Sequence, residues 1–167
     1  PYQHSRQRSR MAEITGDSAK IIATDIDAKR LKKVVENITR LGIKSVEVIP
    51  YKEVHASKFD CILLDVPCSN TGVFARRVEA RFRITPNAIE GLIKTQKKLL
   101  GTAASMLKSN GVICYSTCSI QKDENSNLIR EFLEENPEFV LKYEKLTLQS
   151  AQQFDCDGGY AAILAAE

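Results

Sequence analysis

Two short apolar segments, each followed by a polar turn that contains a cysteine, most constrain the fold of this chain. The first covers residues 59–64 and precedes Asp65-Val66-Pro67-Cys68-Ser69; the second covers residues 111–115 and precedes Ser116-Thr117-Cys118-Ser119. Apolar runs of this length between turn residues are typical of buried parallel strands. Ligands of open α/β sheets bind just beyond the carboxyl ends of such strands. If the two strands are neighbours, two thiols and one carboxylate converge on one pocket, which favours nucleophilic chemistry.

Alternating strand and helix patterns in the rest of the chain predict an α/β fold with a doubly wound, mostly parallel sheet. The helix over residues 28–41 has a capping residue at Asp27 and a stop at Gly42. The last two strands lack a long helix between them, so one of them can be antiparallel. The predicted strands cover residues 20–24, 45–49, 59–65, 112–117, 139–141 and 160–164, and the other predicted helices cover residues 86–107 and 123–135.

The size and composition of the chain fit one domain over residues 1–167. The chain is 43% hydrophobic and 27% charged, as ordinary soluble proteins are. No apolar run approaches the roughly 20 residues of a membrane span. Residues 1–10 are polar and basic, unlike a signal peptide; we expect a disordered segment or the altered front of a helix that runs to about Ile14. We therefore expect a cytoplasmic protein with no membrane partner.

The cysteines are expected to be reduced thiols. Their number, five, is odd, and their spacing is not that of a disulfide scaffold. There is no Cys-x-x-Cys pair, and the only histidines are His4 and His55, so we expect no metal site. The net charge of +3 weakly indicates an anionic partner.

Each candidate site residue has an ordinary structural interpretation beside the functional one. Asp25 follows a predicted strand, where it can accept both hydroxyls of a ribose or simply face solvent. Asp65 can form the turn before Pro67 or hold the amide-like edge of a base. Cys68 and Cys118 can each be a small buried hydrophobe, the usual place of a free cysteine. Two such motifs at successive strand ends seldom coincide by chance, so the pair is more informative than either cysteine.

These segments together resemble the RNA cytosine-5 methyltransferases of the Sun/RsmB (Fmu) type. Residues 65–72, Asp-Val-Pro-Cys-Ser-Asn-Thr-Gly, are similar to motif IV of that family, and residues 115–120, Tyr-Ser-Thr-Cys-Ser-Ile, with Glu124-Asn125-Ser126 after them, are similar to motif VI and the helix that follows. Residues 25–31 resemble motif II, and residues 157–160 resemble the start of the C-terminal strand. The resemblance runs from about Met11 to the end of the chain.

The resemblance implies a Rossmann-like fold and an S-adenosylmethionine-dependent methylation of carbon 5 of cytosine in RNA, with rRNA expected and tRNA as the other class. It makes Cys118 the nucleophile that adds to carbon 6 of the ring and Cys68 the residue that helps product release. Asp65 holds the base and also lies against the cofactor, and Asp25 binds the cofactor. The target base has to leave its stack to be reached.

Two departures from the family affect the cofactor pocket. The glycine-rich motif I is expected just before Met11, where residues 4–10 contain no glycine and the strand before it is missing or altered. No acidic residue occurs near Pro50-Tyr51, where the family has one after its third strand. We therefore expect this chain to bind S-adenosylmethionine weakly or not at all. The alternative is a non-catalytic RNA-binding remnant with a degraded cofactor site.

An arginine-rich loop follows the first cysteine motif. Arg76, Arg77 and Arg81, with Arg83 close by, are predicted to bind RNA phosphates beside the pocket. A solvated basic loop is an equally good interpretation of these residues.

Overall fold

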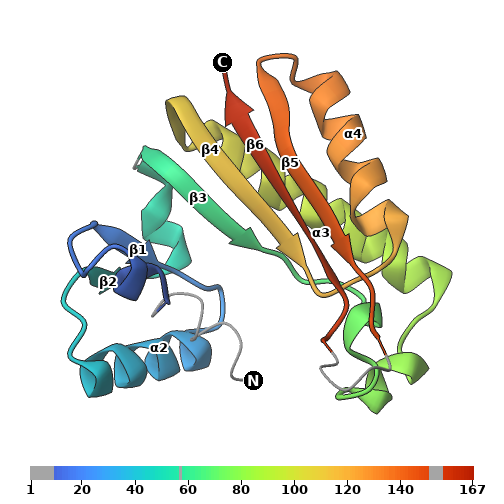
Figure 1. The fold of residues 1–167 in the computed structure, drawn as a ribbon, viewed down its shortest axis with the longest axis horizontal. Helices are drawn as coiled ribbons and strands as arrows, with labels where there is room; N and C mark the ends of the chain where they lie inside the picture. Colours follow the sequence, from blue (N-terminus) through green and yellow to red (C-terminus); the bar gives the residue numbers. More distant parts are fainter. Residues whose placement is uncertain (1–9, 57, 151–155) are drawn as a thin grey trace. The chain divides into compact units, whose positions relative to one another are not determined.

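The computed structural model describes residues 10–56, 58–150 and 156–167 (Figure 1). The chain divides into two compact units, Pro1–Ser57 and Lys58–Glu167. Apart from Arg10, the segment expected to be disordered or altered lies outside the described residues. That residues 1–167 form one catalytic domain stays a prediction.

The first unit consists of two parallel strands connected by a helix. Its elements are β1 (Ile21–Ala23), α2 (Ala28–Leu41), β2 (Val46–Val48) and the 3₁₀ helix η1 (Tyr51–Ala56). The helix has the predicted bounds because local contacts fix both of its ends. The Asp27 carboxylate accepts the N–H of Lys29, and Gly42 closes the helix in the left-handed conformation, with φ 68°.

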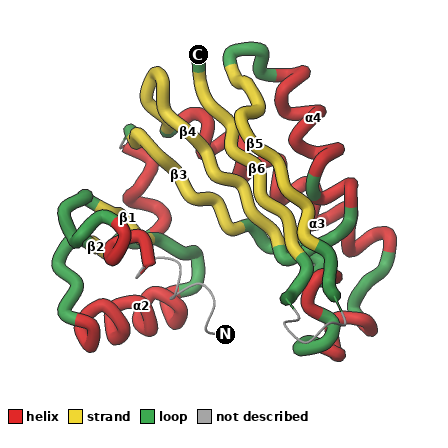
Figure 2. The backbone as a smooth tube through the Cα atoms, viewed as in Figure 1, coloured by secondary structure: helices red, strands yellow, loops and turns green. Residues whose placement is uncertain are grey.

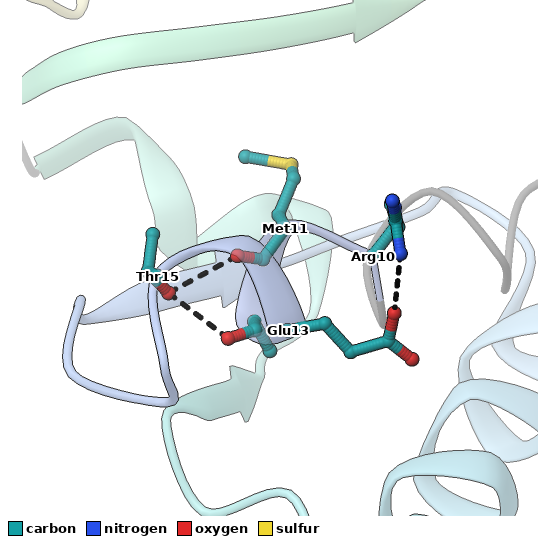
Figure 3. Close-up of polar contacts among 5 residues, drawn as sticks. Arg10, Met11, Glu13 and Thr15 are labelled. Atoms are coloured by element: carbon teal, nitrogen blue, oxygen red, sulfur yellow. Dashed lines mark hydrogen bonds and ion pairs between the residues drawn. The ribbon is translucent and has the colours of Figure 1, made fainter.

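A short helical turn precedes β1 (Figure 3). Thr15 Oγ1 donates to the main-chain oxygen atoms of Met11 and Ala12, at 3.0 and 3.1 Å. Arg10 forms an ion pair with Glu13 at 3.1 Å. The same two carbonyl groups also accept the N–H groups of Thr15 and Asp17, at 3.1 and 2.8 Å. The Thr15 hydroxyl therefore adds a second donor to each of them, and the turn ends where the sequence predicts.

The core of the first unit is small and made of small aliphatic side chains. Its buried residues are Ala12, Ala23, Val34 and Val46, with Ile21, Ile38, Ile43 and Val48 partly buried against them. A core of this kind removes little apolar surface from water, so it contributes modestly to stability.

The second unit is a four-stranded sheet in the order β3-β4-β6-β5 (Figures 1 and 2). Its elements are β3 (Phe59–Asp65), η2 (Thr71–Val73), η3 (Val78–Phe82), α3 (Pro86–Ser105), β4 (Leu107–Thr117), η4 (Lys122–Glu124), α4 (Ser126–Glu135), β5 (Phe139–Thr147) and β6 (Gly159–Ala166). β3 and β4 are parallel, and β6 is antiparallel to both β4 and β5. The predicted α/β fold is confirmed, with β6 as the antiparallel strand of this sheet.

In Figure 1, α3 passes behind the sheet and α4 lies beside β5; residues of both helices pack against the strands in one core. The largest buried side chains at this contact are Leu100 from α3, Leu128 and Ile129 from α4, and Ile113 and Tyr115 from β4. Burial of this apolar face stabilises the sheet and fixes the carboxyl ends of β3 and β4.

The start of β4 differs from the prediction. Helix α3 ends at Ser105, before the Ser109-Asn110-Gly111 sequence that was expected to end it, and the strand begins at Leu107 rather than at Val112. The register of the β3–β4 pair shifts at this point, so the additional residues form a bulge. Asn110 takes φ 62°, a conformation that asparagine tolerates. The turn residues therefore mark the bulge and not the helix end.

The C-terminal elements differ from their predicted bounds as well. The predicted helix over residues 123–135 is divided into η4 and α4 at Asn125, whose φ and ψ are −124° and −109°. β5 and β6 are longer than expected because they pair with each other along most of their length. In the described parts of the chain, no helix has both the length and the apolar character that crossing a membrane requires.

Candidate active site

The two motif cysteines lie in contact beyond the ends of neighbouring parallel strands. The register aligns Asp65, the last residue of β3, with Ser116 in β4. Cys68 and Cys118 follow these strands, and their Sγ atoms are 3.2 Å apart. The structure therefore brings together the two thiols that the sequence places at successive strand ends, while their roles stay predictions.

The two thiols titrate as a pair in which Cys118 is the more acidic. A hydrogen bond from Cys68 lowers the pKa of Cys118, and the nearby Arg77 guanidinium lowers it further, against burial and the Asp65 carboxylate. The same contact, together with burial, raises the pKa of Cys68. The shared proton therefore stays on Cys68, and Cys118 is the sulfur that becomes a thiolate first.

Asn70 holds the loop that carries Cys68 beside Cys118. It adopts the left-handed conformation with φ 60°. Its Nδ2 donates to the Cys68 carbonyl at 2.8 Å, and its Oδ1 lies 3.1 Å from Cys118 Sγ. As a thiol, Cys118 can donate to this oxygen; as a thiolate, it accepts from Cys68.

The turn before β6 packs against both cysteine loops. The Gly158 N–H donates to the Gly72 carbonyl at 2.6 Å, and the Gly72 N–H donates to the Cys118 carbonyl at 3.0 Å. A Cβ atom at Gly72 would lie 2.3 Å from the Gly158 carbonyl oxygen. Glycine is therefore required here, because the main chains approach too closely for any side chain.

The predicted RNA-binding arginines differ in their surroundings. Arg76 forms an ion pair with Asp157 at 3.3 Å, and the Arg81 guanidinium lies 5.4 Å from the centre of the Phe74 ring, in a cation–π contact. Arg77 is the one of the three that is close enough to Cys118 to affect its pKa.

A cavity of about 210 Å³ opens beside Cys68. Its lining combines two cationic groups and one acidic group with polar and apolar ones. They include Cys68, Asn70, Arg77, Glu79, Arg83, Ile89 and Leu92. Apolar walls with two guanidinium groups suit a ligand that has both a flat base and a phosphate.

Asp25 belongs to the first unit and lies just after β1. Its Oδ1 accepts the N–H of Asp27 at 2.9 Å, and its Oδ2 lies 3.8 Å from Arg30. The Asp25 side chain is 12% exposed. A carboxylate has about four acceptor positions, so it can still accept the two hydroxyls of a ribose, and this end of the predicted cofactor site fits its ligand. The glycine-poor segment falls on residues 1–9 and lies outside the described residues.

Sequence reasoning did not find the buried acceptor that joins the two cysteine loops. Glu124 lies in η4 and accepts hydrogen bonds from Ser69, Ser119 and Gln96. Gln96 occurs at helical spacing between Ile93 and Leu100 on the apolar face of α3, and a polar residue there was a usable signal. Glu124 was noted only as part of the resemblance, in Glu124-Asn125-Ser126, and nothing in its surroundings in the sequence indicated that it bonds both cysteine loops.

Comparison with known proteins identifies close similarity over most of the chain. The family model described as 16S rRNA methyltransferase RsmB/F matches residues 6–162. "Ribosomal RNA small subunit methyltransferase B" from Citrobacter koseri is 38% identical over 128 residues, which are 74% of this chain and 30% of that protein. The protein of the same name from Salmonella arizonae is 35% identical over 81% of this chain and 33% of its own length. The chain thus spans about a third of these curated relatives.

Solved structures agree with these matches. NSun6 from Pyrococcus horikoshii, solved with SFG, is 26% identical and superposes with a TM-score of 0.80, covering 96% of this chain and 44% of that one. A methyltransferase homolog protein from the same organism is 26% identical with a TM-score of 0.76, over 96% and 58% of the two chains. The predicted Rossmann-like fold of the methyltransferase type is confirmed.

Proposed function

Because the chain belongs to the RsmB/F family of 16S rRNA methyltransferases, we propose that it carries the catalytic residues of an enzyme that methylates carbon 5 of a cytosine in RNA. The observation that carries this proposal is the 3.2 Å contact between the Cys68 and Cys118 sulfur atoms, beside the strand that ends in Asp65. The substrate we propose is rRNA, modified in the cytoplasm.

Cys118 is the nucleophile in this proposal. Carbon 5 of cytosine is a poor nucleophile, so the ring has to be activated first. The Cys118 thiolate adds to carbon 6 and forms a C–S bond, and the electrons of the C5–C6 double bond make carbon 5 nucleophilic. The lowered pKa of Cys118 supports this role, because only the thiolate attacks.

Cys68 acts at product release. Carbon 5 takes up the methyl group and then loses its proton; the C5–C6 double bond re-forms as the C6–S bond breaks, and Cys118 leaves as a thiolate. The raised pKa of Cys68 keeps this thiol protonated. It can therefore donate a hydrogen bond to the departing Cys118 thiolate, whose Sγ lies 3.2 Å from that of Cys68.

Asp65 holds the edge of the base. It ends β3 beside Ser116 and is close enough to Cys118 to oppose its ionisation. A carboxyl group there can share a proton with the base and neutralise charge that develops on the ring.

S-adenosylmethionine is the proposed methyl donor, and it supplies an electrophilic methyl group when bound. Asp25 would hold its ribose, and Asp65 would contact it as well, as the resemblance to the family implies. The similar structure solved with SFG, an analogue of S-adenosylmethionine, supports this choice.

RNA approaches, in this proposal, through the cavity beside Cys68. Arg77 and Arg83 line it and can bind phosphates, while Ile89 and Leu92 offer apolar contact to a base. Arg76 and Arg81 support the loop through Asp157 and Phe74 as well.

The test of the function compares Cys118→Ala with Cys68→Ala in the presence of S-adenosylmethionine and 16S rRNA, in a protein that contains this chain and a complete cofactor site. Cys118→Ala should abolish methylation and any covalent adduct. Cys68→Ala should allow attack but slow release, so that a protein–RNA complex resistant to denaturant accumulates on a gel.

Two other outcomes would contradict the proposal. If the adduct survives Cys118→Ala and is lost with Cys68→Ala, the roles of the cysteines are reversed. If the parent protein binds rRNA but neither methylates it nor forms an adduct, the chain is a non-catalytic RNA-binding remnant.

The RNA contact is tested by charge reversal. Arg77→Glu should weaken binding to RNAs of any sequence and reduce the salt dependence of the affinity, as loss of a phosphate contact does. Arg76→Glu should do the same to a smaller extent, because Arg76 is partly neutralised by Asp157. Lys142→Glu, on β5 and paired with Glu167 at 2.7 Å, makes the same change of charge as a control. Equal effects of all three variants would mean that only net charge matters.

A further inference from the structure

Glu124 is a fully buried acidic residue between the two cysteine loops. It lies in η4 and has no exposed surface. Among the described residues, it is the one acidic or basic side chain in the buried set. Burying a carboxylate costs free energy unless donors replace water around it, so its contacts decide what it does.

Four donors surround the Glu124 carboxylate. Oε1 accepts the Ser69 N–H at 2.8 Å and Gln96 Nε2 at 3.0 Å. Oε2 accepts the hydroxyl groups of Ser69 and Ser119, each at 2.5 Å. Four donors fill the acceptor positions of an ionised carboxylate, and no cation of the described residues pairs with it.

These donors belong to the two cysteine loops. Ser69 directly follows Cys68, and Ser119 directly follows Cys118. One carboxylate therefore fixes the distance between the two loops. Thr71 adds a second connection between the loops. Its Oγ1 lies 3.0 Å from Ser119 Oγ and accepts the N–H of Ile120 at 3.0 Å.

Gln96 and Asn125 give up other hydrogen bonds to bind Glu124 or the cysteine loops. Gln96 Nε2 donates to Glu124 and to the Pro67 carbonyl at 2.9 Å, which leaves its buried Oε1 without a hydrogen-bond partner. Asn125 precedes α4 but does not cap it; its side chain instead bonds Thr117 and the Ser119 carbonyl. An apolar cluster would hold two loops together without these costs, so the polar arrangement points to a role at the thiols that the two loops carry.

We propose that Glu124 is a positioning residue: by holding Ser69 and Ser119 it keeps Cys68 in hydrogen-bond contact with Cys118, so that Cys68 stabilises the attacking sulfur and later assists its release. The catalytic meaning of this role rests on the proposed function. The titratable groups that face Cys118 are the neutral thiol of Cys68 and the charged side chains of Asp65 and Arg77. Of these, Cys68 is the one whose contact depends directly on Glu124.

The experiment measures how the alkylation of Cys118 by iodoacetamide depends on pH, by peptide mass spectrometry of the full chain. Loss of the Cys68 contact raises the pKa of Cys118, and each unit of increase lowers the thiolate fraction at pH 7 about tenfold. Glu124→Gln replaces one acceptor oxygen by an NH2 group, which cannot accept the donors that bond to that oxygen. We therefore expect the alkylation profile of Cys118 to move to higher pH and its alkylation rate at pH 7 to fall roughly tenfold. Ser119→Ala removes one of the four bonds and should shift the profile less, which provides a milder variant if Glu124→Gln does not fold.

Two controls separate positioning from general destabilisation. Leu128→Ala weakens the core under α4 and removes none of the four hydrogen bonds to Glu124, so it should lower the melting temperature and leave the alkylation profile unchanged. In a Cys68→Ala background, Glu124→Gln should cause no further shift, because the contact that it controls is already absent. A full shift in that background, or an unchanged profile in folded Glu124→Gln or Ser119→Ala, would overturn the proposal.

The alkylation assay needs neither RNA nor cofactor, so the two proposals can fail separately. An unchanged Glu124→Gln profile, with normal methylation of rRNA by the parent protein, would refute the positioning role alone. A shifted profile, with no methylation by the parent protein and no adduct in the Cys68→Ala variant, would refute the proposed function alone.

Discussion

The two compact units fix their turns in different ways. In the first unit, the exposed Asp17 carboxylate accepts the N–H groups of Lys44 and Ser45 at 3.0 and 2.8 Å. In the second unit, the buried Glu124 accepts main-chain and side-chain donors from both cysteine loops. Water competes for the first set of bonds and is excluded from the second, where a low dielectric strengthens them. The buried hydrogen bonds to Glu124 thus hold the loops whose two cysteine sulfur atoms are in contact.

The cores of the two units differ in the size of their side chains. The core cluster of the first unit has four buried aliphatic residues, whereas that of the second includes Tyr115, Phe132, Phe139 and Tyr160. Burial of large side chains contributes most of the stabilisation of a domain. The second unit should therefore be the more stable platform, and the thiol site depends on it.

The largest expected effect is a loss of stability from the core of the second unit. Leu100 is 0% exposed, and Leu100→Ala should cost about 3 kcal/mol from lost burial and the cavity left behind. Val34→Ala in the first unit removes two carbon atoms and should cost roughly 2 kcal/mol. Hydrogen exchange read separately over residues 58–150 and 10–56 checks both values.

If the two units are separate in their energetics, each substitution lowers protection in its own unit only. Equal losses across both segments in either variant would show that the units unfold together, and the comparison above would not hold.

The next effect concerns glycines that are needed for different reasons. Gly72→Ala drives a Cβ atom into the Gly158 main chain and should cost about 1–3 kcal/mol and displace the Cys118 loop. Gly42→Ala in the first unit meets no neighbouring atom but keeps φ 68°, so about 1 kcal/mol is expected. Thermal unfolding measures both.

Gly91→Ala is the matched control, because it lies in α3 with open space around it. It should stabilise the helix by roughly 0.5–1 kcal/mol. A Gly72→Ala chain as stable as the parent would mean that the turn before β6 moves away freely, and the cysteine loops would then not depend on it.

Features set by neighbours in the sequence were predictable. Asp27 and Gly42 fix α2 through contacts within a few residues, so its bounds followed from the sequence alone. The meeting of Cys68 and Cys118 followed from a general property of parallel strands, whose carboxyl ends share one edge of a sheet.

Features set by distant partners were not predictable in this way. The bulge in β4 depends on its register with β3, and its Asn110 looked like a helix stop. The length of β5 depends on pairing with β6, since its own residues are mostly exposed. Glu124 acts through residues that lie up to 55 positions away, and no local pattern separates it from the neighbouring Asp123.

A smaller effect is the order in which the thiols react. The pKa of Cys118 is lowered, while burial raises the pKa of Cys61 and Cys114, and the bond to Cys118 raises that of Cys68. As pH falls below the ordinary thiol value, Cys118 therefore keeps its thiolate longest of these four cysteines and should be alkylated before the other three at pH 7. Because its main partner Cys68 is buried, added salt should change this order little. Preferential alkylation of Cys61 or Cys114 at pH 7, read by mass spectrometry, would contradict the buried-pair description.

The smallest effect tests the exposed turn of the first unit. Hydrogen bonds from Ser45 and Lys44 lower the pKa of Asp17. A carboxylate with a depressed pKa stabilises the fold above its unfolded value of about 3.9, and this stabilisation is lost as pH falls through the folded value. Asp17→Asn should therefore lower hydrogen-exchange protection of residues 10–56 at pH 7 and match the parent near pH 2. Since Asp17 is exposed, high salt should shrink the difference at pH 7, unlike the order of thiol reactivity. A difference that persists at low pH or in high salt would show that Asp17 acts through a shielded contact, and the contrast between an exposed and a buried way of holding turns would then be lost.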